Sequence, residues 1–365
     1  MHITELLTPA YEVAWLPWAV QYFFLAGVAT GAALLAAWCV WGPEGSRRRR
    51  LLPAVLFTLA VTALAAPFSL LADLHQPARF WHFYAYFTPW SWMSLGSLLM
   101  PAFVGLSLAT CASWWLRRLN WARWLAPLLV LSALGVVVYS GGEMMVVRAR
   151  PLWNTVWVPV NLTLTGWLAA VGAIFILERF LPAELRPGAD GLQLLRLSGL
   201  GLAAALVVAA LTWAVIGLTV GSASFSQAVY LFNSFPVWRT TMVGSAIGGV
   251  AVVVALLAGR RLLQHKGYTL ALGLALAAAA WIFRWALFMG VQSVPKYGAG
   301  LYIYSMPLGG DGLMGMLGIA GLCIALVAIL GWALELFPPG DGAAPDHSAA
   351  APATSSHGLQ EPSHG

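Results

Sequence analysis

Apolar runs of spanning length recur along the chain and are separated by short polar segments. Nine such runs fall near residues 16–41, 51–72, 91–115, 124–147, 157–178, 197–219, 237–259, 268–291 and 313–337. As an α-helix, a run of about 20 apolar residues crosses the hydrocarbon core of a bilayer. The pattern therefore predicts an all-α, polytopic transmembrane protein with about nine spans.

Basic residues in the connecting segments alternate between many and few. Of the nineteen lysines and arginines, thirteen follow the first, third, fifth and seventh runs: Arg47, Arg48, Arg49, Arg50, Arg117, Arg118, Arg123, Arg179, Arg186, Arg196, Arg260, Arg261 and Lys266. Five lie in the intervening connections: Arg79, Arg148, Arg150, Arg239 and Lys296. Loops rich in Lys and Arg stay in the cytoplasm, so we expect the N-terminus outside and the C-terminus inside.

The chain divides at its longest predicted cytoplasmic connection, residues 179–196. We expect residues 1–178 to hold the first four runs as a four-helix bundle together with the fifth run, and residues 179–337 to hold the remaining spans. Residues 338–365 are rich in Pro, Ala, Ser and Gly, and such a segment is expected to be a disordered cytoplasmic tail. Gly27 and Gly31 in the first run have the spacing that lets a second helix approach closely.

Composition excludes several other classes of protein. The chain is 60% hydrophobic and 9% charged, with mean hydropathy +0.80, whereas soluble chains carry about 25% charged residues. The net charge of +6 resides in loop clusters, so we expect no nucleic-acid partner. Cys39, Cys111 and Cys323 are too far apart to hold an iron–sulfur cluster, and the spans lack the central histidines of a b-type cytochrome. We also predict no metal site.

Polar and ionisable residues gather where the runs end on the predicted outer side. They are Asp73, His75, Arg79, His82, Tyr84, Tyr86, Tyr139, Glu143, Arg148, Arg150, Gln292, Lys296 and Asp311, with Gln21 at similar depth in the first run. Such groups are unfavourable in a bilayer, so their concentration indicates function. A quinone headgroup needs hydrogen-bond partners and a path for protons, and its tail needs apolar walls. The cluster therefore predicts a quinone site near the outer surface.

Several of these residues also have a structural interpretation. Asp73 can form a surface ion pair with Arg79, and Glu143 can pair with one of the arginines that follow it. Arg284 lies within the eighth run, so we expect it either to extend towards the headgroups or to meet a carboxylate.

Four segments carry a family resemblance. They are WLPWAVQYFFLAGVATGAALLAAW in the first run, LLADLHQPARFWHFYAYFTPWSWM after the second, the stretch from Tyr139 to Asn154, and VPKYGAGLYIYSMPLGGDG before the last. Together they resemble the polysulfide-reductase (NrfD-type) membrane subunits, and most closely the anchor subunits of tetrathionate reductases. The resemblance covers all nine runs.

This resemblance implies a subunit of the bacterial cytoplasmic (inner) membrane that oxidises quinol and anchors a periplasmic oxidoreductase. The implied substrate is menaquinol or ubiquinol, with no haem and no iron–sulfur cluster in this chain. The implied partners are an iron–sulfur subunit of the four-cluster ferredoxin-like type, which receives the electrons, and a molybdopterin catalytic subunit. Both would dock on the periplasmic face.

In the family, quinone contacts come from the start of the first span, the PARF-containing loop and the tyrosine before the RPLWN run. On this sequence these positions fall on Gln21, with Trp18 one turn earlier, on His75 and on Tyr139. Polysulfide-type members carry an acid at the His75 position and a histidine at the Gln21 position.

These matches give each residue an expected role. Tyr139 and Gln21 would hydrogen-bond the headgroup oxygens. His75 would accept a proton, and Asp73 or Glu143 would pass it to the outside.

Arg150, with Arg148 and Lys296, would steady the site or dock the partner.

Other interpretations stay open at this point. The chain could be a purely structural anchor, with quinol oxidised by the partner. A transporter is disfavoured, because no pair of Gly- or Pro-broken runs occupies matching positions in two halves. The terminal acceptor is set by another chain, so polysulfide, thiosulfate, sulfite or arsenate stand beside tetrathionate.

Overall fold

A computed structural model describes residues 13–74, 76–294 and 304–339. Within these residues nine helices are long and apolar enough to cross a membrane. They are α1 (Pro17–Val40), α2 (Arg47–Asp73), α4 (Trp92–Trp115), α5 (Leu119–Met145), α6 (Trp157–Leu177), α7 (Gly188–Thr219), α9 (Pro236–Leu257), α10 (Lys266–Trp285) and α11 (Leu313–Leu336). The described part contains no strand. The prediction of an all-α protein with nine spans is confirmed.

Short helical elements occupy several connections. They are η1 (Pro77–Arg79) and α3 (His82–Ala85) after α2, η2 (Glu178–Phe180) and η3 (Ala183–Leu185) after α6, α8 (Ala223–Ser234) between α7 and α9, and η4 (Arg260–Gln264) before α10. A single π-helical turn, η5 (Ala286–Gly290), continues α10. Because α7 begins at Gly188, the connection predicted over residues 179–196 is shorter than expected, while the division of the chain there stays a prediction.

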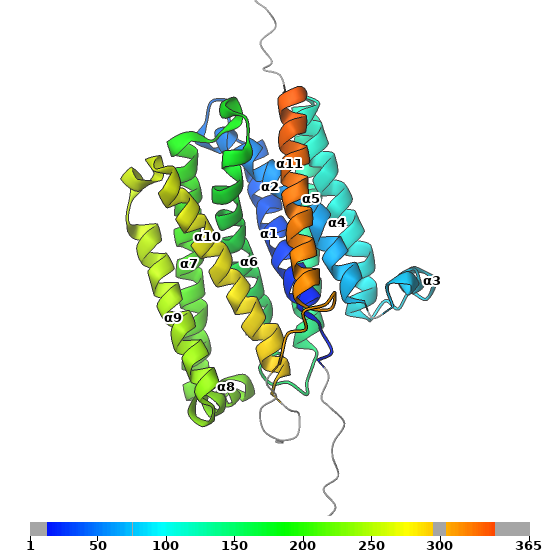
Figure 1. The fold of residues 1–365 in the computed structure, drawn as a ribbon, viewed down its shortest axis with the longest axis vertical. Coiled ribbons are helices and arrows are strands. Elements are labelled where there is room, and N and C mark those ends of the chain that lie inside the picture. Colours follow the sequence, from blue (N-terminus) through cyan, green and yellow to red (C-terminus); the bar gives the residue numbers. More distant parts are fainter. Residues whose placement is uncertain (1–12, 75, 295–303, 340–365) are drawn as a thin grey trace, which may run out of the picture.

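The long helices run side by side and alternate in direction (Figure 1). The connections α1–α2, α4–α5, α6–α7 and α9–α10 lie at one end of the bundle, which we call the basic face because it holds most of the arginines. The elements α3 and α8 and the start of α11 lie at the other end, the site face. That the basic face is cytoplasmic stays a prediction.

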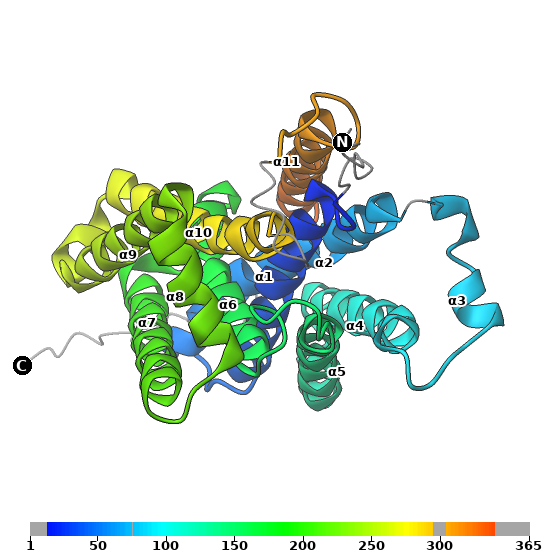
Figure 2. The same ribbon diagram turned by 90° about the horizontal axis from the view of Figure 1, so that it is seen from below.

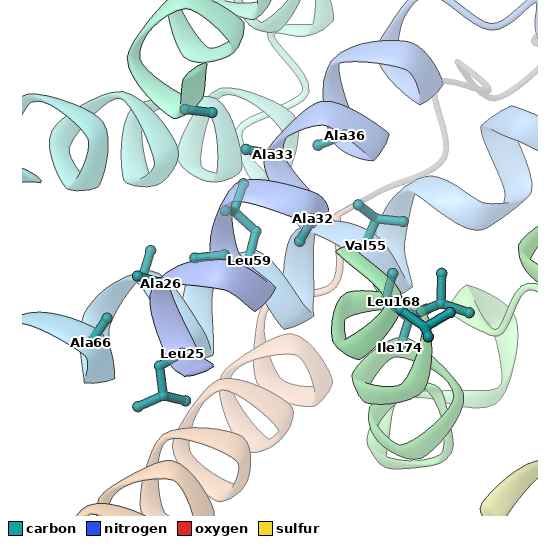
Figure 3. Packing of buried hydrophobic residues seen from close by; sticks show 14 of the residues in the cluster. Leu25, Ala26, Ala32, Ala33, Ala36, Val55, Leu59, Ala66, Leu168 and Ile174 are labelled. Atoms are coloured by element: carbon teal, nitrogen blue, oxygen red, sulfur yellow. The ribbon is translucent and has the colours of Figure 1, made fainter. Parts of the chain in front are cut away.

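Helix α1 lies near the middle of the bundle, with α7 and α9 to one side and α4 and α5 to the other (Figure 2). It contacts α2, α5, α6, α10 and α11. Of the 18 residues in its most apolar stretch, 72% are buried inside the protein, the same share as in α2, whereas in α9 the share is 11%. Small side chains make this central position feasible, since Ala26, Ala32, Ala33 and Ala36 let the neighbouring helices come close (Figure 3).

The small-residue pair of the first run is the contact with α6. A Cβ atom on Gly27 would lie 2.9 Å from the Cα of Gly166, and one on Gly31 would lie 2.9 Å from the Cα of Trp167. Neither distance is compatible with a side chain, so both glycines are needed for this helix pair.

Arg284 is buried in the middle of the bundle, with 1% of its surface exposed. Its Nε donates to the carbonyl of Phe23 (3.0 Å), and its Nη2 donates to that of Leu162 (2.9 Å). Its Nη1 donates to the Thr165 hydroxyl (3.0 Å) and to the Ala280 carbonyl (3.1 Å). The expectation that it would reach the headgroups or meet a carboxylate is wrong, because helix carbonyls and a hydroxyl accept its hydrogen bonds, and no described carboxylate pairs with it.

Candidate functional site

Tyr139 lies near the end of α5 at the site face and is 3% exposed. Its ring lies against Gly96 of α4, where any Cβ atom would collide with the ring. Its phenol interacts with the phenol of Tyr22 on α1 and with the carboxyl of Glu143. Tyr139 therefore occupies a slot formed by α1, α4 and its own helix.

Glu143 follows Tyr139 by four residues, a spacing that places two side chains on the same helix face. It interacts with Tyr139 and electrostatically with Asp73. The neighbouring Gly142 lets the Trp92 ring lie directly against α5, since a Cβ there would be 2.7 Å from that ring. A phenol and two carboxyl groups thus meet at the site face beneath an aromatic side chain.

Asp73 is the last residue of α2, and its Oδ1 accepts a hydrogen bond from the backbone N–H of Leu16 (3.1 Å). This contact fixes the segment just before α1 against the end of α2. Asp73 and Arg79 are both described, and no ion pair joins them. The predicted proton acceptor His75 lies outside the described residues.

Trp18 and Gln21 face α11. The Gln21 amide Nε2 donates to the Met316 carbonyl (2.9 Å), and the Trp18 ring lies against Gly315. The backbone carbonyl of Trp18 accepts from the Ser69 hydroxyl (2.8 Å).

Three buried polar atoms near this end of α1 make no regular hydrogen bond within the described part of the chain. They are Oε1 of Gln21, the hydroxyl of Tyr22 and the hydroxyl of Ser140. The Tyr22 hydroxyl nevertheless lies close enough to those of Tyr139 and Ser140 to interact with both. Buried polar groups are normally satisfied, so Oε1 of Gln21, which has no such neighbour, retains the capacity to accept a hydrogen bond from a hydroxyl group of a ligand. That chemistry fits a quinol headgroup.

Arg150 belongs to a different contact. It is buried in the connection between α5 and α6, and its Nη1 donates to the carbonyls of Val291 (2.7 Å) and Val294 (3.1 Å). Its guanidinium lies 5.2 Å from the Trp153 ring centroid. Lys296, assigned with it from the sequence, lies outside the described residues, and Arg148 is exposed.

The structure brings Tyr139, Glu143 and Asp73 together and adds Tyr22, which was not predicted from the sequence. Tyr22 stands next to Gln21, but its side chain points to α5 while that of Gln21 points to α11. A phenol inside an apolar run resembles any core aromatic residue, so the only available signal was its position beside Gln21.

Comparison with known proteins assigns the chain that carries these buried phenols and carboxyl groups to a family of membrane proteins. A family model described as "Polysulphide reductase, NrfD" matches residues 6–296. The chain belongs to this family and is an integral membrane protein.

One relative makes the family assignment more specific. The chain is similar to a tetrathionate reductase subunit of Salmonella typhimurium (strain LT2), with 37% identity over 343 residues that cover 90% of this chain and 94% of the relative. The resemblance inferred from the four sequence segments is confirmed.

Proposed function

We propose that this chain is the quinol-oxidising membrane subunit of a tetrathionate reductase in a bacterial cytoplasmic membrane. The observation that carries the proposal is the cluster of Tyr22, Tyr139, Glu143 and Asp73, which sets phenols and carboxyl groups between apolar helices at the site face. The similarity to a subunit named for that reductase supports the choice of complex.

Each residue of the site has a role in this proposal. The phenol of Tyr139 and the unpaired Oε1 of Gln21 bind the hydroxyl groups of menaquinol or ubiquinol, with Tyr22 beside Tyr139 and Trp18 against the ring or tail. Arg150 holds the α5–α6 connection against the end of α10.

Oxidation of one quinol releases two electrons and two protons. His75 takes the first proton. Glu143, which interacts with Tyr139, and Asp73 then pass protons to the outer surface, since carboxyl groups are suitable general bases. The electrons leave to an iron–sulfur subunit of the four-cluster ferredoxin-like type on the periplasmic side. That subunit delivers them to a molybdopterin subunit, where tetrathionate is reduced.

The test is quinol oxidation by membranes that contain the whole complex, with tetrathionate as acceptor. Tyr139→Phe should lower kcat/KM for quinol about tenfold, the equivalent of one hydrogen bond of ~1.4 kcal/mol. Glu143→Gln should lower kcat about a hundredfold, as expected for a lost proton acceptor. Tyr230→Phe, which changes an exposed tyrosine of α8 at the same face, serves as the matched control.

The outcomes separate the alternatives. If Tyr139→Phe and Glu143→Gln leave quinol oxidation unchanged in complexes that retain the iron–sulfur subunit, the chain is a structural anchor. If wild-type membranes oxidise quinol with polysulfide, thiosulfate, sulfite or arsenate but not with tetrathionate, the quinol site stands and the named acceptor is wrong.

A further inference from the structure

An apolar groove of about 260 Å³ lies between α1, α6 and α7, in the half of the bundle next to the basic face. Its walls include Leu34 and Trp38 of α1, Trp167 and Val171 of α6, and Leu202 of α7. The volume is near the lower end of ligand pockets, which begin at roughly 300 Å³. It therefore has room for a stretch of hydrocarbon chain rather than for a bulky ligand. The quinol site described above is at the other end of these helices.

A cation stands at one end of this groove. Trp38 is 40% exposed, and the guanidinium of Arg48 lies 5.1 Å from the centroid of its ring. Arg48 belongs to the run Arg47–Arg50, which forms the first turn of α2, and that turn has no acidic residue. These four like charges repel one another, and the partial positive charge at the N-terminal end of a helix adds to them. The first turn of α2 therefore favours an anion.

Two carboxylates lie near this arginine run, and both act on arginines other than Arg48. Glu44, in the α1–α2 connection, interacts electrostatically with Arg49. Asp190 accepts from Arg50 (3.4 Å) and from Arg260 (3.0 Å). Arg48 forms no ion pair within the described residues, and its guanidinium instead lies over the Trp38 ring. The charge of Arg48, which lies at the end of the groove, is thus left for an anion from outside the chain.

We propose that this groove binds one acyl chain of an anionic phospholipid, whose phosphate group lies at Arg48 and the first turn of α2. Apolar walls that end at a basic cluster match the two parts of such a lipid, and basic pockets between membrane helices bind anionic headgroups. A quinone tail would fill the same walls, but an uncharged quinone would supply no counter-charge for Arg48. The charge therefore favours the phospholipid.

The proposal is tested by lipid titration of the purified full-length chain in detergent, with bound lipid counted by native mass spectrometry. The probes are dioleoyl phosphatidylglycerol and, as the zwitterionic comparison, dioleoyl phosphatidylcholine. Wild type should bind one phosphatidylglycerol more tightly than phosphatidylcholine. Arg48→Gln should weaken phosphatidylglycerol binding about fivefold, whereas Arg118→Gln, at the α4–α5 connection of the same face, should not. Leu202→Trp, which fills the groove, should weaken both lipids, and Leu211→Trp, on the exposed side of α7, should weaken neither.

Several results would overturn the proposal. They are the absence of a headgroup preference in wild type, equal effects of Arg48→Gln and Arg118→Gln, or the release of a co-purified quinone by Leu202→Trp with unchanged phosphatidylglycerol binding. Thermal unfolding verifies that each variant is folded. If Leu202→Trp does not fold, the proposal is judged from the headgroup preference of wild type and from the comparison of Arg48→Gln with Arg118→Gln.

Discussion

Arg284 shows how this protein accommodates a charge inside the bilayer. Burying a guanidinium is strongly unfavourable unless its donors are satisfied. Here four hydrogen bonds reach acceptors on α1, α6 and α10. Helix carbonyls have a second lone pair that can accept without breaking the helix. The side chain therefore joins three helices that are distant in the sequence.

The glycines around this arginine give a prediction at the residue scale. A Cβ on Gly27 would lie 2.7 Å from Nη2 of Arg284, and a Cβ on Gly166 would lie 2.8 Å from the same atom. Gly27→Ala and Gly166→Ala should each destabilise the protein by about 1–3 kcal/mol, the usual effect of overpacking. The measurement is thermal unfolding of the purified chain in detergent.

The matched control is Gly244→Ala on α9, because a Cβ there meets no heavy atom within 4 Å. The midpoint of its thermal unfolding should equal that of wild type or lie slightly higher, since alanine is a better helix former than glycine. Equal midpoints for all three variants would show that the close approach of α1 and α6 does not limit stability.

The residues of the site differ in how far the sequence could predict them. Tyr139 and Glu143 are one helical turn apart, so their common face follows from helix geometry alone. Their proximity to Asp73 follows from the alternation of the spans. Tertiary packing decides which side of α1 faces α5, and the sequence does not reveal it. Tyr22, which lies on that side, was therefore not predicted as part of the site. The acceptors of Arg284 belong to helices up to 261 residues away, and no local pattern indicates them.

At the scale of elements, the end of α10, in the second half of the chain, is held by contacts from the first half. Gln292 exchanges hydrogen bonds with the backbone of Trp15, through Oε1 (2.9 Å) and Nε2 (3.0 Å). Arg150 binds carbonyls on either side of Gln292. Carbonyls at a helix end lack partners within the helix, and a cation there is favourable. These contacts attach the turn after η5 to the α5–α6 connection and to the start of α1.

Arg150→Met tests whether this attachment is structural. It should lower stability by about 1.5–3 kcal/mol, because hydrogen bonds from a charged group are lost, while KM for quinol changes little. Thermal unfolding and quinol kinetics of the complex measure the two effects, with Arg148→Met as the exposed control two residues away. Unchanged stability with a raised KM would instead make Arg150 a direct substrate contact.

The helices themselves were largely predictable, because each span must be apolar over the thickness of the bilayer. Their ends were less so. Helix α5 begins at Leu119 and α7 at Gly188, five and nine residues before the predicted runs at 124 and 197. Hydropathy reports only the part of a helix within hydrocarbon, and these helices continue into the polar zone. Helix α8 was not predicted because, with 12 residues, it is too short to cross a bilayer and forms no spanning apolar run.

At the scale of the whole molecule, the two ends of the bundle differ in charge. Four arginine-containing connections lie at the basic face, and the phenol and carboxyl cluster lies at the site face. Under the proposed function, and with the basic face in the cytoplasm, protons from quinol would be released into the periplasm without crossing the membrane.

Single cysteines test this orientation. Glu184→Cys lies in the α6–α7 connection at the basic face, and Ser226→Cys lies on α8 at the site face; both positions are exposed. In intact spheroplasts a membrane-impermeant maleimide should label the cysteine at 226 and reach that at 184 only after permeabilisation. The native cysteines lie within spans, and a variant without added cysteine sets the background. The reverse labelling pattern would place the basic face outside.

The central position of α1 also has a consequence for the time course of synthesis. It leaves the ribosome well before three of the helices that cover it, α6, α10 and α11, which come much later in the chain. Phe23 and Arg284 are separated by 261 residues, which corresponds to roughly 13–50 s at a translation rate of about 5–20 residues per second. During that interval α1 must be covered by lipid or by the insertion machinery, and the interior is completed only when the eighth span arrives.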